Sequence, residues 1–153
     1  MTGNTLATPW LSKDQQQVWR TFLDGFARIK QELDDELRPF GLDLSVYEIL
    51  LRLSESAERS MRMSDLAIAA RQSRSRLTHS ITRMEDKGLV RRLPCPDDRR
   101  GVIAQLTEEG NALLQEATPT HVERVRTVLV DAVEPNDLEA LGRAMDAVVK
   151  VTN

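Results

Sequence analysis

The chain has 153 residues, of which 41% are hydrophobic and 29% are charged, and its formal net charge is −3. This composition is typical of a soluble globular protein, and no apolar run approaches the roughly 20 residues that a membrane span needs. One cysteine excludes an internal disulfide framework and suits a reducing, cytoplasmic location. The first residues have neither the basic nor the apolar segment of a secretory signal, so export is not expected.

Residues 1–11 are predicted to form a flexible N-terminus. A capping box that starts at Ser12 predicts the beginning of a helix, and apolar residues then recur at helical spacing. Pro39 and Gly41 are stop signals. Residues 12–40 are therefore predicted to form one long N-terminal helix with a dimerisation role.

Short elements are expected in the middle of the chain. A second capping box at Ser45 predicts a short buried helix in VYEILLRLSES, and RSMRM is a candidate strand. Ser64 is the predicted N-cap of the next helix. Ser73 is the predicted N-cap of the helix after that, which should end at Gly88.

Two strands and two helices complete the prediction. LVRRL and VIAQL are the strands, joined by a PCPDDRRG loop. Thr107 should cap a helix that Pro119 kinks or restarts. This order predicts a mostly α protein with a minor β component. Residues 45–107 would be a winged helix-turn-helix DNA-binding domain, and residues 108–150 would be C-terminal dimerisation helices.

The first and last helices carry apolar stripes that a small winged domain could not cover. Pairing with a second copy of the chain would bury these stripes, so a homodimer is expected. Two recognition helices in such a dimer would reach half-sites about one helical turn, or ~10 bp, apart.

Charge is distributed unevenly along the chain. Residues 59–107 contain eleven Lys and Arg and five Asp and Glu, a net of +6, whereas the remaining ten basic and nineteen acidic residues carry −9. A basic middle between acidic ends is expected of a nucleic-acid-binding core whose flanking segments do something else. Local imbalance also occurs on ordinary solvated surfaces, so charge alone does not decide the matter.

The second helix of the helix-turn-helix should present a polar and basic face. If Leu77, Ile81 and Met84 face inward, the outward face has no acid before Glu85. Arginine can bond a guanine edge, and hydroxyls serve bases or phosphates. An ordinary solvated helix is the alternative, but it would usually mix acids among the bases. The predicted DNA contacts are Ser73, Arg74, Ser75, Arg76, Thr78, His79, Thr82 and Arg83.

The hairpin that follows should place its charged tip beside this helix. Arg99 and Arg100 are the predicted wing contacts, because a narrow minor groove concentrates negative potential. Asp98 is expected to pair with a nearby arginine, preferably Arg100, and to orient it. Gly101 would permit the turn into the second strand. The alternative is an incidental surface salt bridge.

These motifs resemble the MarR (multiple antibiotic resistance regulator) family of bacterial transcription factors. The family's wing signature, Asp-x-Arg followed by a strand and Leu-Thr-x-x-Gly, matches Asp98 to Gly110, and SRSRLTHSITRMEDKGLVRR is similar to its recognition region, with Met84 for the usual leucine. The resemblance runs from about Ser12 to Val149. It implies an obligate homodimer on a pseudo-palindromic operator. Many members are repressors released by small aromatic or phenolic ligands.

The sequence offers candidate residues for two kinds of sensor. Trp19, Phe22, Phe26 and Tyr47 are candidates for an effector pocket, although their spacing also suits a core. Cys95 is a candidate redox residue, because cationic surroundings favour thiol oxidation; a small residue in a tight loop is the alternative.

No metal site or further cofactor is expected. The two histidines, His79 and His121, have no metal-ligand spacing, and there is no Cys-x-x-Cys.

The sequence therefore predicts a homodimeric, sequence-specific transcriptional regulator, favoured as a ligand-responsive repressor. Its recognition helix would enter the major groove and a wing arginine the minor groove. The alternative is a winged-helix protein-interaction module without operator specificity, whose acidic outer helices engage a basic partner. No phosphate loop or nucleophile elbow is present, so an enzyme is not expected. The sequence leaves open the operator, the regulated genes, the effector and the choice between repression and activation.

Overall fold

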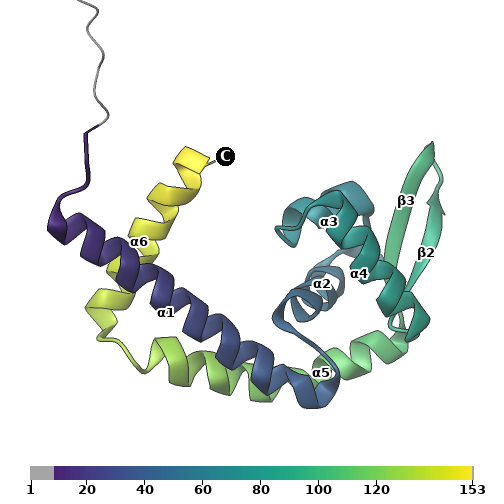
Figure 1. Ribbon diagram of the computed structural model, residues 1–153. Helices are drawn as coiled ribbons and strands as arrows, with labels where there is room; N and C mark the ends of the chain where they lie inside the picture. Colours follow the sequence, from purple (N-terminus) through teal and green to yellow (C-terminus); the bar gives the residue numbers. More distant parts are fainter. Residues whose placement is uncertain (1–8, 153) are drawn as a thin grey trace, which may run out of the picture.

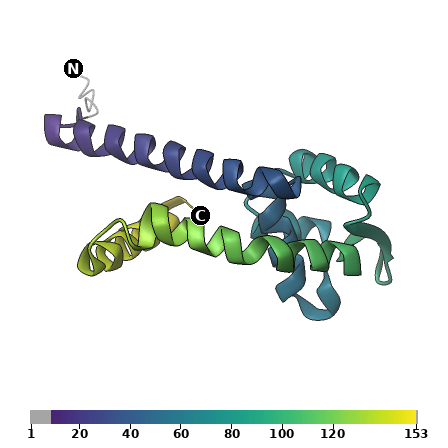
Figure 2. The same ribbon diagram turned by 90° about the horizontal axis from the view of Figure 1, so that it is seen from below.

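The computed structural model describes residues 9–152. Two long helices, α1 (Lys13–Leu37) and α5 (Glu108–Val125), converge on a small winged domain, and α6 (Pro135–Thr152) lies at the far end of both (Figure 1). The view from below shows the same convergence of α1 and α5 (Figure 2). Most of the stretch expected to be flexible, residues 1–8, lies outside the described residues; residues 9–11 have no regular structure.

Helix α1 begins as predicted. The Gln15 backbone N–H donates to Ser12 Oγ at 3.1 Å, and the Ser12 N–H donates to Gln15 Oε1 at 2.9 Å, which is the expected capping box. The helix passes into a 3-10 turn, Arg38–Phe40, and the chain reverses at Gly41 with a left-handed φ of 72°. Both stop signals therefore act where the sequence places them.

Helix α2 (Leu44–Glu55) does not use the predicted capping box. Its N-cap is Asp43, whose Oδ1 accepts the Val46 N–H at 2.9 Å. The prediction of Ser45 as N-cap is wrong because an aspartate two residues earlier offers an equally good acceptor. Glu48 instead lies 3.6 Å from Arg52 Nε and 3.5 Å from Arg71 Nη2.

The helix-turn-helix follows strand β1 (Ser60–Arg62). Helix α3 (Met63–Ala69) has Arg62 at its N-cap position without a side-chain bond, so Ser64 lies inside the first turn and the predicted cap is wrong. Helix α4 (Arg74–Asp86) is capped as predicted, since Ser73 Oγ accepts the Arg76 N–H at 3.2 Å.

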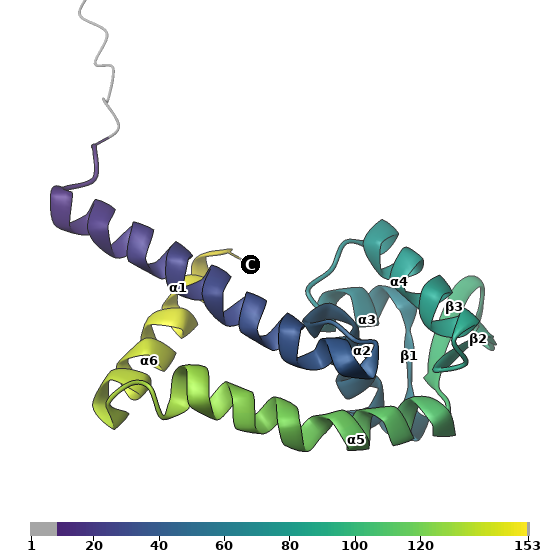
Figure 3. The same ribbon diagram turned by 60° about the horizontal axis from the view of Figure 1, so that its bottom comes forward.

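Three antiparallel strands in the order β1-β3-β2 form the sheet, with β2 (Val90–Cys95) and β3 (Asp98–Leu106) as the wing hairpin. Most of the predicted PCPDDRRG loop is strand, and only residues 96–97 form the turn. The register jumps from the Pro94–Val102 pair to the Cys95–Asp98 pair, so residues 99–101 bulge out of the ladder. Pro94 is tolerated because β2 is an edge strand. Figure 3 shows this hairpin next to α4.

Helix α5 starts at the predicted cap, where Thr107 Oγ1 accepts the Gly110 N–H at 3.0 Å. Of the expected kink or restart at Pro119, the restart is wrong, because one helix continues through Pro119 to Val125. The flanking residues Leu114 and Ala117 are buried, so packing outweighs the one backbone bond that proline removes. A π-helical segment, Arg126–Val130, interrupts the helix only later.

The core belongs to the winged domain and to the parts of α1 and α5 that cover it. The predicted inward face of α4 is confirmed, since Leu77, Ile81 and Met84 are all buried. None of the residues of α6 is buried. Across residues 9–152, no helix combines the length and apolar character needed to cross a membrane.

The single chain leaves apolar faces of α1 and α6 exposed. Val18 and Phe26 of α1 are 70% and 60% exposed, and Val148 of α6 is 47% exposed. Between the two helices lies an apolar groove of about 660 Å³, whose wall includes Trp19 and Met145. The expected stripes are thus present, and this chain by itself does not cover them.

Candidate nucleic-acid interface

Helix α4 and its N-cap carry the eight residues that were predicted to contact DNA from the recognition helix, and all eight are exposed. Three of the hydroxyl-bearing residues in this set are hydrogen-bonded to the backbone of the helix. Ser73 caps the helix, Thr78 Oγ1 donates to the Arg74 carbonyl at 2.9 Å, and Thr82 Oγ1 donates to the Thr78 carbonyl at 3.0 Å. These hydroxyls are held against the helix and have acceptor lone pairs left for a partner. The set comprises Ser73, Arg74, Ser75, Arg76, Thr78, His79, Thr82 and Arg83.

The arginines of this face carry charge that other residues do not neutralise. Among the ion pairs formed within residues 9–152, none includes Arg74, Arg76 or Arg83. Arg74 and Arg76 lie in the first turn of the helix, the part that reaches base edges in helix-turn-helix proteins. The N-terminal half of α4 is therefore an exposed cationic surface.

The wing is built differently from the prediction. Asp98 Oδ1 accepts the backbone N–H of Arg100 at 2.9 Å, and no ion pair between described residues involves Asp98. The expected bond to the Arg100 guanidinium is therefore wrong. A short aspartate side chain reaches the amide two residues ahead more easily than a long, mobile guanidinium. Asp98 shapes the backbone of the tip and leaves the Arg100 side chain exposed.

Gly101 serves close packing rather than a left-handed turn. A Cβ at this position would lie 2.9 Å from the Cβ of Cys95. Cys95 itself is 7% exposed. Because the residue is buried, the structure gives an oxidant little access and does not favour the redox interpretation.

The helix and the wing enclose a common cleft of about 390 Å³. Arg74 of α4 and Arg100 of β3 both line it, together with Asp98, and its wall also includes Met63 and Ser64 of α3. Arg99 is exposed at the tip and does not line the cleft. Two cations from elements far apart in the sequence thus face one space, where a phosphodiester could meet both.

One residue that joins the helix to the wing was not among the predicted site residues. Arg92, on β2, donates from Nη1 to Glu85 Oε1 at 3.0 Å and from Nη2 to Thr82 Oγ1 at 2.6 Å. Its backbone N–H also donates to Glu85 Oε2 at 2.9 Å. Side chains alternate along a strand, so either Arg91 or Arg92 had to face α4, but the sequence does not say which.

The four aromatic residues proposed for an effector pocket are not brought together. Trp19, Phe22 and Phe26 stack in a row along α1, with ring centroids 6.1 and 6.4 Å apart. Tyr47 is buried in α2, where its ring centroid lies 4.1 Å from that of His121. The predicted pocket of all four is therefore wrong, because the helical spacing that aligned three of them has no bearing on Tyr47.

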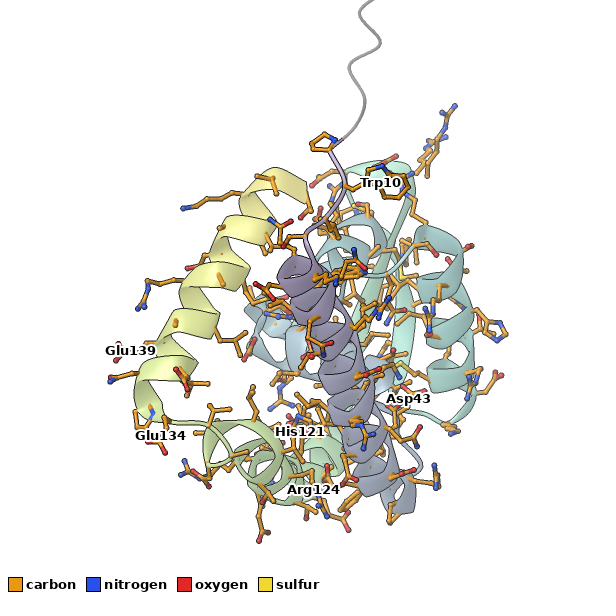
Figure 4. All side chains as sticks on the ribbon, turned by 60° about the vertical axis from the view of Figure 1, so that its left-hand side comes forward. Trp10, Asp43, His121, Arg124, Glu134 and Glu139 are labelled. Atoms are coloured by element: carbon orange, nitrogen blue, oxygen red, sulfur yellow. The ribbon has the colours of Figure 1, made fainter. Side chains whose placement is uncertain are left out.

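His121 sits between the long helices, and Figure 4 labels it with Arg124 on α5 beside α1. Its Nδ1 lies 3.6 Å from Oε2 of Glu36, and both side chains are buried. Burial lowers the pKa of His121, and the nearby Glu36 carboxylate opposes that shift. His79, in contrast, is exposed on α4. In the part of the chain that the structure describes, no three His, Cys, Asp or Glu side chains form a metal-binding group.

A short helix, a turn, an exposed cationic helix and a hairpin with a basic tip define a winged helix-turn-helix DNA-binding protein. The MarR family model matches residues 42–102. AbsC, a MarR family transcriptional regulator from Streptomyces coelicolor, is similar in structure, with a TM-score of 0.90 and 46% identity over 95% of this chain and 98% of AbsC. Sco3205, a MarR family regulator from the same organism that was solved in complex with DNA, has a TM-score of 0.92 and 37% identity, covering 95% and 92% of the two chains.

A curated transcriptional regulator is also similar to this chain in sequence. The regulator PecS of Dickeya dadantii is 34% identical over 102 residues, which are 66% of this chain and 61% of PecS. The match thus leaves more than a third of PecS uncovered, whereas AbsC is matched over nearly its whole length. The chain belongs to the MarR family of transcriptional regulators.

Proposed function

We propose that this chain is a homodimeric repressor that binds a pseudo-palindromic DNA operator. Residues 45–107 would bind DNA, with α4 in the major groove and the wing in the flanking minor groove. The observation that carries the proposal is that Arg74 and Arg100, from separate elements, line the same exposed cleft. The chain would act in the bacterial cytoplasm and would have no catalytic role.

The apolar faces of α1 and α6 support the dimer. Monomeric proteins rarely leave a contiguous apolar surface of this kind in water. A second copy would cover it with the same surface, as a two-fold interface requires. Residues 12–40 and 108–150 would then be the dimerisation part, and the two α4 helices would be presented to successive turns of one face of the duplex.

A small aromatic or phenolic effector remains part of the proposal, because the family resemblance implies one. The aromatic row on α1 is better placed for the dimer seam than for an enclosed pocket, since Trp19, Phe22 and Phe26 are exposed in the single chain. A thermal-shift series with salicylate and related phenolic acids tests this part. A rise in melting temperature together with loss of DNA binding supports an effector, and no shift at millimolar concentration contradicts it.

Selection from a random duplex library tests the DNA-binding proposal directly. The full chain should enrich an inverted repeat with half-site centres about 10 bp apart, and its log affinity should fall steeply against log salt. Arg74→Ala should weaken binding to the selected duplex, with Arg28→Ala on α1 as the matched control. If the library yields no preferred sequence, the protein-interaction alternative replaces this proposal.

A further inference from the structure

We propose that Arg92 is a positioning residue that fixes the wing relative to the recognition helix, so that both fit one operator half-site. The inference rests on the DNA-binding function proposed above. It concerns a residue on the strand that precedes the wing tip, whose side chain bonds α4 and also lines the cleft that Arg74 and Arg100 share.

Arg92 ties β2 to two successive turns of α4. Its Nη2 donates both to the Thr78 carbonyl, at 3.2 Å, and to Thr82 Oγ1, at 2.6 Å. Its Nη1 donates to Glu85 Oε1 at 3.0 Å, and its backbone N–H donates to Glu85 Oε2 at 2.9 Å. A planar fork that makes several bonds at once holds its partners in one geometry, which a flexible point charge does not.

These bonds are the direct polar connection between helix and wing. Among the side-chain hydrogen bonds of residues 9–152, every one that joins α4 to β2 involves Arg92. Strand β2 in turn carries β3, through pairs that include Leu93–Ile103 and Pro94–Val102. Since Arg100 projects from β3, its position relative to Arg74 depends on how β2 is seated on α4.

Arg92 differs from the arginines that we expect to meet DNA. Three of the five guanidinium N–H donors are already used, Glu85 balances the charge, and the side chain is only 28% exposed. Removing a phosphate contact weakens binding to all duplexes alike, whereas misplacing the wing affects only binding that engages helix and wing together. Direct phosphate binding by Arg92 is therefore the competing outcome of the test.

The test is a double-mutant cycle between Arg92→Ala and Arg100→Ala, measured on the duplex selected by the full chain and on a scrambled duplex of the same composition. In the wild-type background, Arg100→Ala should weaken binding to the selected duplex about tenfold. In the Arg92→Ala background the same change should cost less than about threefold, because the wing is no longer held in place. Arg92→Ala alone should bind the scrambled duplex within about twofold of the wild type.

Two results would overturn the inference: an equal cost of Arg100→Ala in both backgrounds, or an equal loss on both duplexes when Arg92 is removed. Arg91→Ala is the matched control, because this arginine lies on the same strand but its side chain faces away, toward a shallow cavity with Glu58 and Arg59. It should leave the cost of Arg100→Ala unchanged. Thermal melts of every variant establish that the protein is folded at the assay temperature.

Two further variants keep the test decisive if Arg92→Ala does not fold. Glu85→Ala removes two of the four bonds that Arg92 makes to α4 and leaves its charge without a partner carboxylate. Binding to the scrambled duplex should therefore rise and discrimination should fall; unchanged discrimination would count against positioning. Arg92→Lys keeps the charge but loses the fork, and it should reproduce the weakened coupling to Arg100. Full wild-type coupling in this variant would show that charge alone suffices and would overturn the inference.

The two proposals fail in different ways. If no duplex is selected, the DNA-binding proposal itself is wrong. If a duplex is selected and bound, but the cycle is additive, only the positioning role of Arg92 is lost.

Discussion

Gly110→Ala should destabilise the protein, although alanine is the better helix former. Gly110 lies in the first turn of α5, and a Cβ there would be 2.1 Å from the backbone oxygen of Leu89 and 2.7 Å from Cδ1 of Leu106. Real Cβ atoms essentially never approach closer than 3.0 Å, so a separation of at least 0.9 Å would have to open against backbone. Overpacking of this kind costs about 1–3 kcal/mol, and a backbone neighbour places it at the upper end, against about 1 kcal/mol of helix propensity in favour of alanine.

The close approach is part of a small network that docks α5 on the winged domain. Thr107 Oγ1 donates to the Gly88 carbonyl at 2.6 Å, the Thr107 N–H donates to the Leu89 carbonyl at 3.1 Å, and the Gly110 N–H donates to Thr107 Oγ1 at 3.0 Å. The Leu-Thr-x-x-Gly motif therefore has a physical reason. A Cβ at its last position would push the helix off the carbonyl that the motif binds.

Urea unfolding at one fixed protein concentration measures the effect. Gly110→Ala should lower the free energy of unfolding by about 2 kcal/mol or more. Gly142→Ala is the matched control, since Gly142 is an exposed residue in the middle of α6 and no atom lies within 4 Å of the added Cβ. It should raise the free energy of unfolding by about 0.5–1 kcal/mol. If both variants were equally stabilised, the packing of α5 against Leu89 would be refuted.

Three other predictions follow from the same structure. Arg74→Ala should cost about 1–3 kcal/mol of affinity for the selected duplex and relax its base preference, measured by fluorescence anisotropy; unchanged affinity would contradict the contact. Phe26→Glu places a charge on the exposed apolar face of α1, so it should give monomers in sedimentation equilibrium, whereas Arg28→Glu on the same helix should stay dimeric. If both variants were dimers, this face of α1 would not be the dimer interface. Because burial lowers the pKa of His121, the unfolded chain binds the proton first, so stability should fall as the pH drops below the ordinary value of 6.5. Thermal melts at pH 7.5 and 5.5 should show a larger loss for the wild type than for His121→Gln, and equal losses would contradict it.

Local patterns in the sequence were sufficient for three of the helix starts and for the buried face of α4, but not for the caps of α2 and α3. The capping box at Ser12 and the caps at Ser73 and Thr107 involve residues three apart, so they can be predicted without knowledge of the tertiary structure. The inward face of α4 follows from helical periodicity in the same way, and its members, including Leu77, are buried.

The relations between elements could not be predicted, because they depend on register and packing. The orientation of Arg92 toward α4 is set by the pairing of β2 with β3, which the pattern LVRRL does not specify. The partner of Asp98 depends on the geometry of a two-residue turn and a bulge, where the sequence indicated a loop. Residue type alone groups Tyr47 with the aromatic residues of α1, whereas the structure places it against His121.

The central claim, that paired chains place a helix and a wing arginine in adjacent grooves, is tested most directly by a hydroxyl-radical footprint of the selected duplex with wild-type protein and with Arg100→Ala. The wild type should protect two symmetric half-sites whose centres lie about 10 bp apart, with minor-groove protection on their flanks. Arg100→Ala should keep the central protection and lose the flanks. A single, asymmetric footprint, or flanks that are unchanged without the Arg100 side chain, would contradict this account.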